Sequence, residues 1–178
     1  ATHKVRDLCT GNGSLGLIAA HVYPDVQVLG ADLSPEALDV AKINIDRHGM
    51  QERMQLVLSD GLNAPALQAA GPFDLILCNP PYVNARSMSA LPAEYRAEPA
   101  MAHDGGEDGL DLVRTLLTEA PKHLNPGGGM LCEIGRGRDI LEAEFPDLDF
   151  LWVETTEEED AVFWISAEAL GVKAKKGK

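Results

Sequence analysis

The chain has little of what a metal centre, a disulfide framework or a membrane span requires. Its 178 residues include three cysteines without C-x-x-C spacing and five scattered histidines without metal-ligand spacing. We therefore expect Cys9, Cys78 and Cys132 to be small core residues, and we expect no bound metal. No apolar run approaches about 18 residues, and nothing at the start reads as a signal peptide. These absences predict a cytoplasmic protein that does not contact the membrane.

Basic residues are also scarce. The chain has 15 Lys and Arg against 28 Asp and Glu, a net charge of -13, and residues 157–160 form a dense acidic cluster. Such a field repels the phosphates of nucleic acid and suits a basic protein partner. Ordinary solubility explains the cluster equally well. From the charge balance we expect no direct contact with nucleic acid.

Length and composition predict one domain. With 45% hydrophobic residues, the chain can bury a single core without disulfides or a metal. We assign residues 1–170 to this domain and residues 171–178 to a basic, disordered tail.

Helix signals and apolar runs alternate along the chain, which predicts an α/β fold. Ser34 is the expected N-cap of a helix that begins at Pro35 and stops at His48 and Gly49. Another helix is predicted over about residues 110–123, before an Asn-Pro-Gly-Gly turn.

Seven apolar runs are predicted to be strands. The last two are too close together for a crossover helix, so we expect them to pair as an antiparallel hairpin. The predicted strands are 5–9, 26–31, 54–58, 74–78, 130–134, 150–153 and 161–165.

A glycine-rich turn follows the first predicted strand. Gly11, Gly13 and Gly16 fit the spacing G-x-G-x-x-G, in which the missing Cβ atoms let the backbone turn tightly and approach a nucleotide-type ligand. Asp32 ends the second strand, where its carboxylate can accept two ribose hydroxyls. Asp60 follows the third strand and can accept the amino group of an adenine. This arrangement serves either NAD or S-adenosylmethionine.

Three features favour S-adenosylmethionine. Asp7 lies inside the first strand, where a buried carboxylate needs a partner such as the ammonium of an amino-acid moiety. No Lys or Arg lies between Asp7 and Lys42 to receive a pyrophosphate. Asp60 supplies the adenine contact. An NAD-dependent oxidoreductase and a non-catalytic cofactor-binding domain remain the alternatives.

The sequence Asn79-Pro80-Pro81-Tyr82 directly follows the fourth strand. The prolines remove two backbone donors and hold the chain extended, so that the carbonyl oxygens of Asn79 and Pro80 can point into a pocket. Two rigid acceptors suit an NH2 group. A turn that merely ends the strand is the simpler explanation of this motif taken alone.

Taken together, these motifs resemble those of the protein glutamine N5-methyltransferases, over roughly residues 5–166. Cys9 resembles the members that act on a large-subunit ribosomal protein more than those that act on peptide release factors, where Gly is usual. Release factors are the second candidate target. Nucleic-acid amino methyltransferases share the Asn-Pro-Pro-Tyr motif. The matching segments are 7–13, 31–34, 59–60, 79–83, 98–99, 107–111 and 125–128.

The resemblance implies a Rossmann-like class I methyltransferase that uses S-adenosylmethionine. Its seven-stranded mixed sheet has the order 3-2-1-4-5-7-6, with helices on both faces. The family carries an N-terminal substrate-recognition region, which we expect this chain to lack. The implied cofactor-binding residues are Asp7, Thr10, Gly11, Asn12, Gly13, Gly16, Asp32, Leu33, Asp60, Gly61 and Asn79; the implied catalytic residues are Asn79, Pro80 and Tyr82; and Pro81 joins these three in binding the substrate.

The predicted chemistry addresses the weak nucleophilicity of an amide nitrogen. The Asn79 side-chain oxygen and the Pro80 carbonyl oxygen would each accept one N–H of the substrate amide, orient the nitrogen and stabilise developing positive charge. Tyr82 would cover the amide face. We also expect the long connection 83–107 to face the substrate.

Overall fold

The computed structural model describes residues 2–80, 108–154 and 162–174. The strands are β1 (Lys4–Leu8), β2 (Gln27–Asp32), β3 (Met54–Leu58), β4 (Phe73–Cys78), β5 (Leu124–Glu133), β6 (Leu151–Val153) and β7 (Val162–Ser166). The helices are α1 (Ser14–Val22), α2 (Pro35–Arg47), α3 (Pro65–Ala69), α5 (Asp111–Glu119), the short 3-10 helix η3 (Ala120–Lys122) and α6 (Arg138–Glu144).

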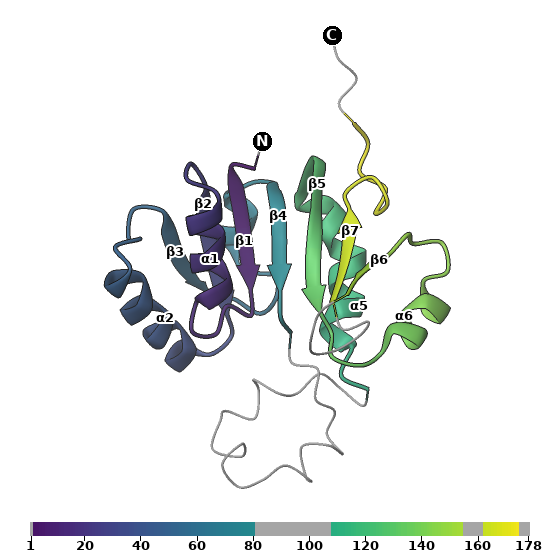
Figure 1. Ribbon diagram of the computed structural model, residues 1–178, viewed down its shortest axis with the longest axis horizontal. Helices are drawn as coiled ribbons and strands as arrows, with labels where there is room; N and C mark the ends of the chain where they lie inside the picture. Colours follow the sequence, from purple (N-terminus) through teal and green to yellow (C-terminus); the bar gives the residue numbers. More distant parts are fainter. Residues whose placement is uncertain (1, 81–107, 155–161, 175–178) are drawn as a thin grey trace, which may run out of the picture.

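The strands form one seven-stranded sheet in the order β3-β2-β1-β4-β5-β7-β6. The first five strands are parallel, and β7 pairs antiparallel with both β5 and β6. The predicted order and the terminal hairpin are therefore confirmed. Figure 1 shows that the carboxyl ends of β1, β4 and β5 lie at the same edge of the sheet.

Local signals explain where α2 begins and ends. The Ser34 hydroxyl oxygen accepts the Ala37 N–H at 3.2 Å, which satisfies one of the free donors of the first turn, and Pro35 follows at the first helical position. Gly49 has a φ of +66°, which an L side chain rarely adopts. The predicted start and stop of this helix are confirmed.

Each face of the sheet carries its own buried cluster. On one face, Leu17 and Ala20 of α1 and Ile45 of α2 pack against strand residues such as Val5 and Val28. The other face carries the larger cluster, to which α3, α5 and α6 contribute Leu67, Leu116 and Leu141. Helices thus cover both faces, as predicted, and leave the carboxyl ends of the strands for a ligand (Figure 1).

Some predicted boundaries were wrong. The α-helix after residue 110 ends at Glu119, because Pro121 has no N–H with which to continue it, and the chain passes into η3. β5 begins at Leu124 rather than 130, so the predicted Asn-Pro-Gly-Gly turn lies within a strand, beside a register shift between Phe73 and Leu75. The helices α3 and α6 were not predicted.

Other predictions fall outside the described residues. These are Pro81, Tyr82, the connection 83–107, the acidic cluster 157–160 and the tail beyond residue 174. Within the described ranges, no helix is both long and apolar enough to cross a membrane.

Arg6 is a charged side chain inside the larger core. It is fully buried in β1, its Nη2 donates to the Leu67 carbonyl at 2.8 Å, and its guanidinium lies 4.0 Å from the centre of the Phe73 ring. Among the described residues, neither Nε nor Nη1 has a hydrogen-bond partner. Burial lowers the pKa of Arg6 to about 10. The desolvation of this charge is thus only partly offset.

Arg6→Met should leave the free energy of unfolding unchanged or raise it by about 1–4 kcal/mol, because methionine fills similar volume without a buried charge. Urea denaturation at pH 7 measures this. Arg53→Met is the matched control, because Arg53 Nη1 donates to the Ala20 and Pro24 carbonyls at 2.8 and 2.7 Å. The control should lose about 1.5–3 kcal/mol. A loss of more than about 0.5 kcal/mol for Arg6→Met would contradict the prediction.

Candidate functional site

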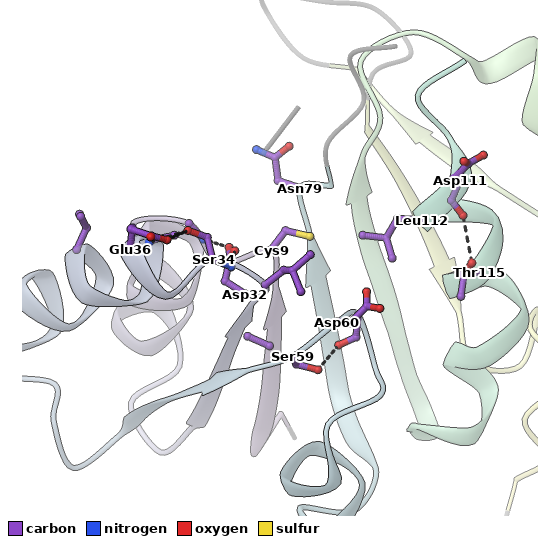
Figure 2. A pocket seen from close by; sticks show the side chains of 16 residues that line it. Cys9, Asp32, Ser34, Glu36, Ser59, Asp60, Asn79, Asp111, Leu112 and Thr115 are labelled. Carbon is purple, nitrogen blue, oxygen red and sulfur yellow. Dashed lines mark hydrogen bonds between the residues drawn. The ribbon is translucent and has the colours of Figure 1, made fainter. Parts of the chain in front are cut away.

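A cavity of about 610 Å³ opens at the carboxyl ends of the parallel strands (Figure 2). Residues from the ends of β1 to β4, from α2 and from α5 form its walls. They are Cys9, Gly11, Ala31, Asp32, Leu33, Ser34, Glu36, Ala37, Val40, Ser59, Asp60, Gly61, Asn79, Asp111, Leu112 and Thr115.

Asp7 holds the glycine-rich turn in place by hydrogen bonds. One oxygen of this fully buried carboxylate, Oδ2, accepts the Thr10 hydroxyl at 2.6 Å and the Gly16 N–H at 2.8 Å. A Cβ on Gly16 would lie 3.0 Å from that oxygen and 2.6 Å from Met54 Cε, so a larger residue here would displace the end of the Met54 side chain and crowd the carboxylate. Asp7 thus joins the end of β1 to the first turn of α1.

The second carboxylate oxygen of Asp7, Oδ1, is buried and makes no hydrogen bond within the described residues. Burial raises the pKa of the Asp7 carboxyl from 3.8 to about 6, while the hydrogen bonds from Thr10 and Gly16 lower it. Asp7 does not line the cavity, so its observed contacts shape the turn.

Asp32 connects the glycine-rich turn to the end of β2. Its Oδ2 accepts the Gly11 N–H and its Oδ1 accepts the Ser34 N–H, both at 2.9 Å. Each oxygen keeps a lone pair, and the side chain lines the cavity. Asp32 can therefore fix the loop and still accept hydrogen bonds from a ligand.

The turn after β3 supplies the opposite end of the cavity. The Ser59 hydroxyl donates to the Gly61 carbonyl at 2.8 Å and accepts the Ala64 N–H at 3.1 Å. Gly61 has a φ of +55°, and a Cβ there would lie 3.5 Å from Leu112 Cδ1. This turn holds Asp60 in the wall of the cavity (Figure 2).

Asn79 reaches the same cavity from the end of β4. The strand residue before it, Cys78, is buried, Pro80 after it is buried, and Asn79 itself is exposed. Figure 2 shows the Asn79 amide toward one end of the cavity and Asp60 toward the other, with Cys9 between them. Contact with the Cys78 thiol, together with burial, raises the pKa of Cys9, which keeps it a neutral thiol.

The structure brings together only part of the predicted site. Gly11, Asp32, Leu33, Asp60, Gly61 and Asn79 line the cavity, whereas Asp7, Thr10, Asn12, Gly13, Gly16 and Pro80 do not. Asn12 instead accepts the Ser14 N–H and hydroxyl, at 3.1 and 2.7 Å, at the start of α1. The residues of the glycine-rich turn among them contribute to the shape of that turn.

Sequence reasoning missed the wall that α5 provides. Asp111, Leu112 and Thr115 line the cavity, and Val113 and Leu116 are buried toward the sheet. Part of the signal was present, because on an amphipathic helix with its apolar residues at 113, 116 and 117, Leu112 lies at the edge of the buried face, whereas 111 and 115 lie on the exposed side.

The cavity is acidic. Its lining contains the carboxylates of Asp32, Glu36, Asp60 and Asp111 and, within the described part of the chain, no Lys, Arg or His. Such a lining suits a ligand with hydroxyl groups and positive charge, and it would repel a pyrophosphate. The sheet order above this cavity is that of a class I methyltransferase-type domain.

The chain belongs to the Methyltransferase small domain family, which matches residues 1–94. It is 50% identical over 170 residues to the ribosomal protein uL3 glutamine methyltransferase of Bradyrhizobium diazoefficiens, covering 96% of this chain and 52% of that protein. The protein of the same name from Bordetella pertussis is 48% identical over 167 residues, with coverages of 94% and 55%. The chain thus spans about half the length of the curated relatives it matches.

Solved structures share the fold. An O-methyltransferase family protein from Burkholderia thailandensis has a TM-score of 0.62 at 17% identity and covers 93% of this chain and 51% of its own. A ribosomal protein L11 methylase from Lactobacillus delbrueckii subsp. bulgaricus has a TM-score of 0.61 at 22% identity, with coverages of 93% and 70%. Both support the observed class I methyltransferase architecture.

The raised pKa of Asp7 predicts a pH dependence of stability. Because the folded protein holds this proton more tightly than the unfolded chain, the charged carboxylate destabilises the fold above about pH 6, and that penalty fades as the pH falls toward 4. Asp7→Asn removes the titration. Relative to the wild type, the variant's free energy of unfolding should therefore fall by about 1–3 kcal/mol between pH 7 and pH 4.5.

Urea denaturation at both pH values tests this. Asp25→Asn is the control, because it removes one negative charge from an exposed turn. The difference in free energy of unfolding between Asp25→Asn and the wild type should be the same at both pH values, within about 0.5 kcal/mol. A constant difference for Asp7→Asn as well would refute the prediction.

Proposed function

We propose that the chain transfers a methyl group from S-adenosylmethionine to the side-chain amide nitrogen of a glutamine in a large-subunit ribosomal protein. The observation that carries this proposal is that Asn79 lines the same cavity as Asp32 and Asp60. A side-chain amide that can orient an NH2 group thus lies beside two carboxylates that can hold a nucleoside.

The cavity fits this cofactor. Asp32 would accept the ribose hydroxyls and Asp60 the adenine amino group. Leu33 and Val40 line the cavity with exposed fractions of 46% and 48%, and Leu112 lines it from α5. Such apolar surface is explained if these side chains cover the faces of a base. The acidic lining favours the positive sulfonium.

Asp7 has a supporting role in the proposed site. Its unpartnered Oδ1 is a buried acceptor beside the glycine-rich turn, so the ammonium of the cofactor could satisfy it through water. Its bonded oxygen holds Thr10 and Gly16 in place.

The bound cofactor would supply a methyl group made electrophilic by its positively charged sulfur. The chain's own part is to prepare the amide. The Asn79 side-chain oxygen and the Pro80 carbonyl oxygen each accept one N–H, which points the nitrogen lone pair at the methyl and stabilises positive charge on the nitrogen. Tyr82 lies outside the described residues, and its cover of the amide face stays a prediction. No general base is needed before the transfer.

The choice of target rests on charge and on the relatives. A net charge of -13 suits a basic ribosomal protein and repels DNA. The relatives with 46–50% identity are named for ribosomal protein uL3. Because the chain spans about half the length of those proteins, we propose this activity rather than taking it from their names.

Asn79→Ala should slow methyl transfer by roughly 10²–10³ and leave the affinity for S-adenosylmethionine nearly unchanged, because it removes an acceptor that acts on the substrate amide. Asp32→Ala is the opposite control and should weaken cofactor binding more than it slows the chemical step. Turnover with labelled S-adenosylmethionine and isothermal titration separate the two effects. An Asn79→Ala variant with near wild-type turnover would remove Asn79 from the mechanism.

The target itself is tested by presenting a large-subunit ribosomal protein fraction, a release factor and unmethylated duplex DNA in parallel, with the modified site mapped by mass spectrometry. We expect label on a ribosomal-protein glutamine. Label on the release factor would keep the chemistry and change the target, and label on DNA would overturn the charge argument. Titration with NADH should show no binding, because the acidic lining repels its phosphates.

A further inference from the structure

The wall of the cavity formed by α5 depends on how this helix begins. Asp111, Leu112 and Thr115 all lie in its first turns, opposite the walls from β2 and β3 (Figure 2). The N-cap, Leu110, has no side-chain hydrogen bond to hold the first turn. A rotation or slide of this turn would move that wall, so something else must fix it.

Arg114 binds carboxylates from three parts of the chain at this point. Its Nε and Nη2 donate to both oxygens of Glu144, at 2.7 and 2.9 Å, and Nη1 donates to Asp108 Oδ1 at 2.9 Å. Nη2 also contacts the second oxygen of Asp108, and Nη1 donates to Asp111 at 3.2 Å. The planar fork of the guanidinium thus holds two carboxylates bidentately, which a point charge cannot do.

Asp108 passes this restraint to the helix start. Asp108 Oδ1, which accepts the Arg114 Nη1–H, also accepts the Leu110 N–H at 3.1 Å. One carboxylate therefore joins Arg114 to the N-cap. Leu110 is fully buried and packs on Gly137, where a Cβ would lie 2.9 Å from Leu110 Cδ1. The starts of α5 and α6 are therefore fitted together, and Glu144 ties the far end of α6 to Arg114.

The Arg114 cluster, formed by Arg114, Asp108, Asp111 and Glu144, differs from a simple surface ion pair. The Arg114 side chain is 28% exposed, and its guanidinium lowers the pKa of both Asp108 and Glu144. The pair of Lys122 and Glu119, in contrast, joins one Lys to one carboxylate at exposed fractions of 68% and 38%. Isolated exposed pairs of this kind contribute little, whereas bidentate networks can fix a geometry.

We infer that Arg114 is a positioning residue: by holding Asp108 and Glu144 it fixes the first turn of α5 and, with it, one wall of the cofactor cavity. This inference rests on the proposed function, because it assigns that cavity to S-adenosylmethionine. Arg114 does not touch the ligand and acts through Leu112 and its neighbours.

Isothermal titration with S-adenosylmethionine tests the inference. Arg114→Met should raise the Kd roughly tenfold to a hundredfold, because the wall loses its fixed position. The Kd of Arg114→Lys should stay close to that of Arg114→Met, since lysine restores the charge without the planar guanidinium fork. Lys122→Met, the matched control on η3, should keep the Kd within about twofold of the wild type.

A double-mutant cycle separates positioning from general loss of stability. If Asp108 acts through Arg114, the double variant Arg114→Met, Asp108→Asn should raise the Kd no more than Arg114→Met alone. Hydrogen exchange should rise at residues 110–115 in Arg114→Met and stay unchanged in β1 and β2, which shows that the variant is folded. An unchanged Kd in Arg114→Met, or a fully additive double variant, would overturn the inference. A wild type that binds no S-adenosylmethionine would instead overturn the proposed function.

Discussion

The geometry of the cavity depends on one buried carboxylate oxygen, Asp7 Oδ2, which ties the end of β1 to the start of α1. Through this tie the backbone between them curls over the strand ends, and the Gly11 N–H meets Asp32. The two carboxylates are therefore coupled. Asp7 fixes the glycine-rich turn, and the turn, through the Gly11 N–H, fixes Asp32 in the wall of the cavity. A buried charge is a costly way to hold a loop, but one oxygen here accepts hydrogen bonds from both the Thr10 hydroxyl and the Gly16 N–H.

The opposite wall is held in a different way. α5 packs its apolar side, including Leu110 and Val113 at its start, into the larger core, which fixes its distance from the sheet. Arg114 adds a second restraint from outside, through carboxylates before the helix and at the end of α6. The loop side of the cavity is thus fixed by burial, and the helix side by a partly exposed charge network. Salt screens the second kind of restraint more than the first.

Much of this arrangement could be predicted from the sequence, for identifiable reasons. Short apolar runs, Ser34 before Pro35 and the close spacing of the last two runs were enough for the strands, α2 and the hairpin. Asp32, Asp60 and Asn79 each follow a parallel strand, so their meeting at one edge follows from the topology. What pattern could not give was the direction of individual side chains. The sequence predicted a buried Asp7 but not its hydrogen bonds to Thr10 and Gly16, and the wall from α5 depends on Arg114 contacts spanning up to 30 residues.

The division of the cavity also bears on the proposed chemistry. In a methyl transfer from a sulfonium to an amide, positive charge leaves the sulfur and appears on the nitrogen. Carboxylates that favour the cofactor's charge stabilise the ground state at least as much as the transition state, so they contribute affinity rather than rate. Only acceptors at the nitrogen gain strength during the reaction. Figure 2 places Asn79 toward the end of the cavity away from Asp60, which separates the group that could accelerate transfer from a group that could hold the cofactor. The carboxylates of the cavity therefore act on cofactor affinity, and the neutral acceptor at Asn79 acts on the rate of transfer.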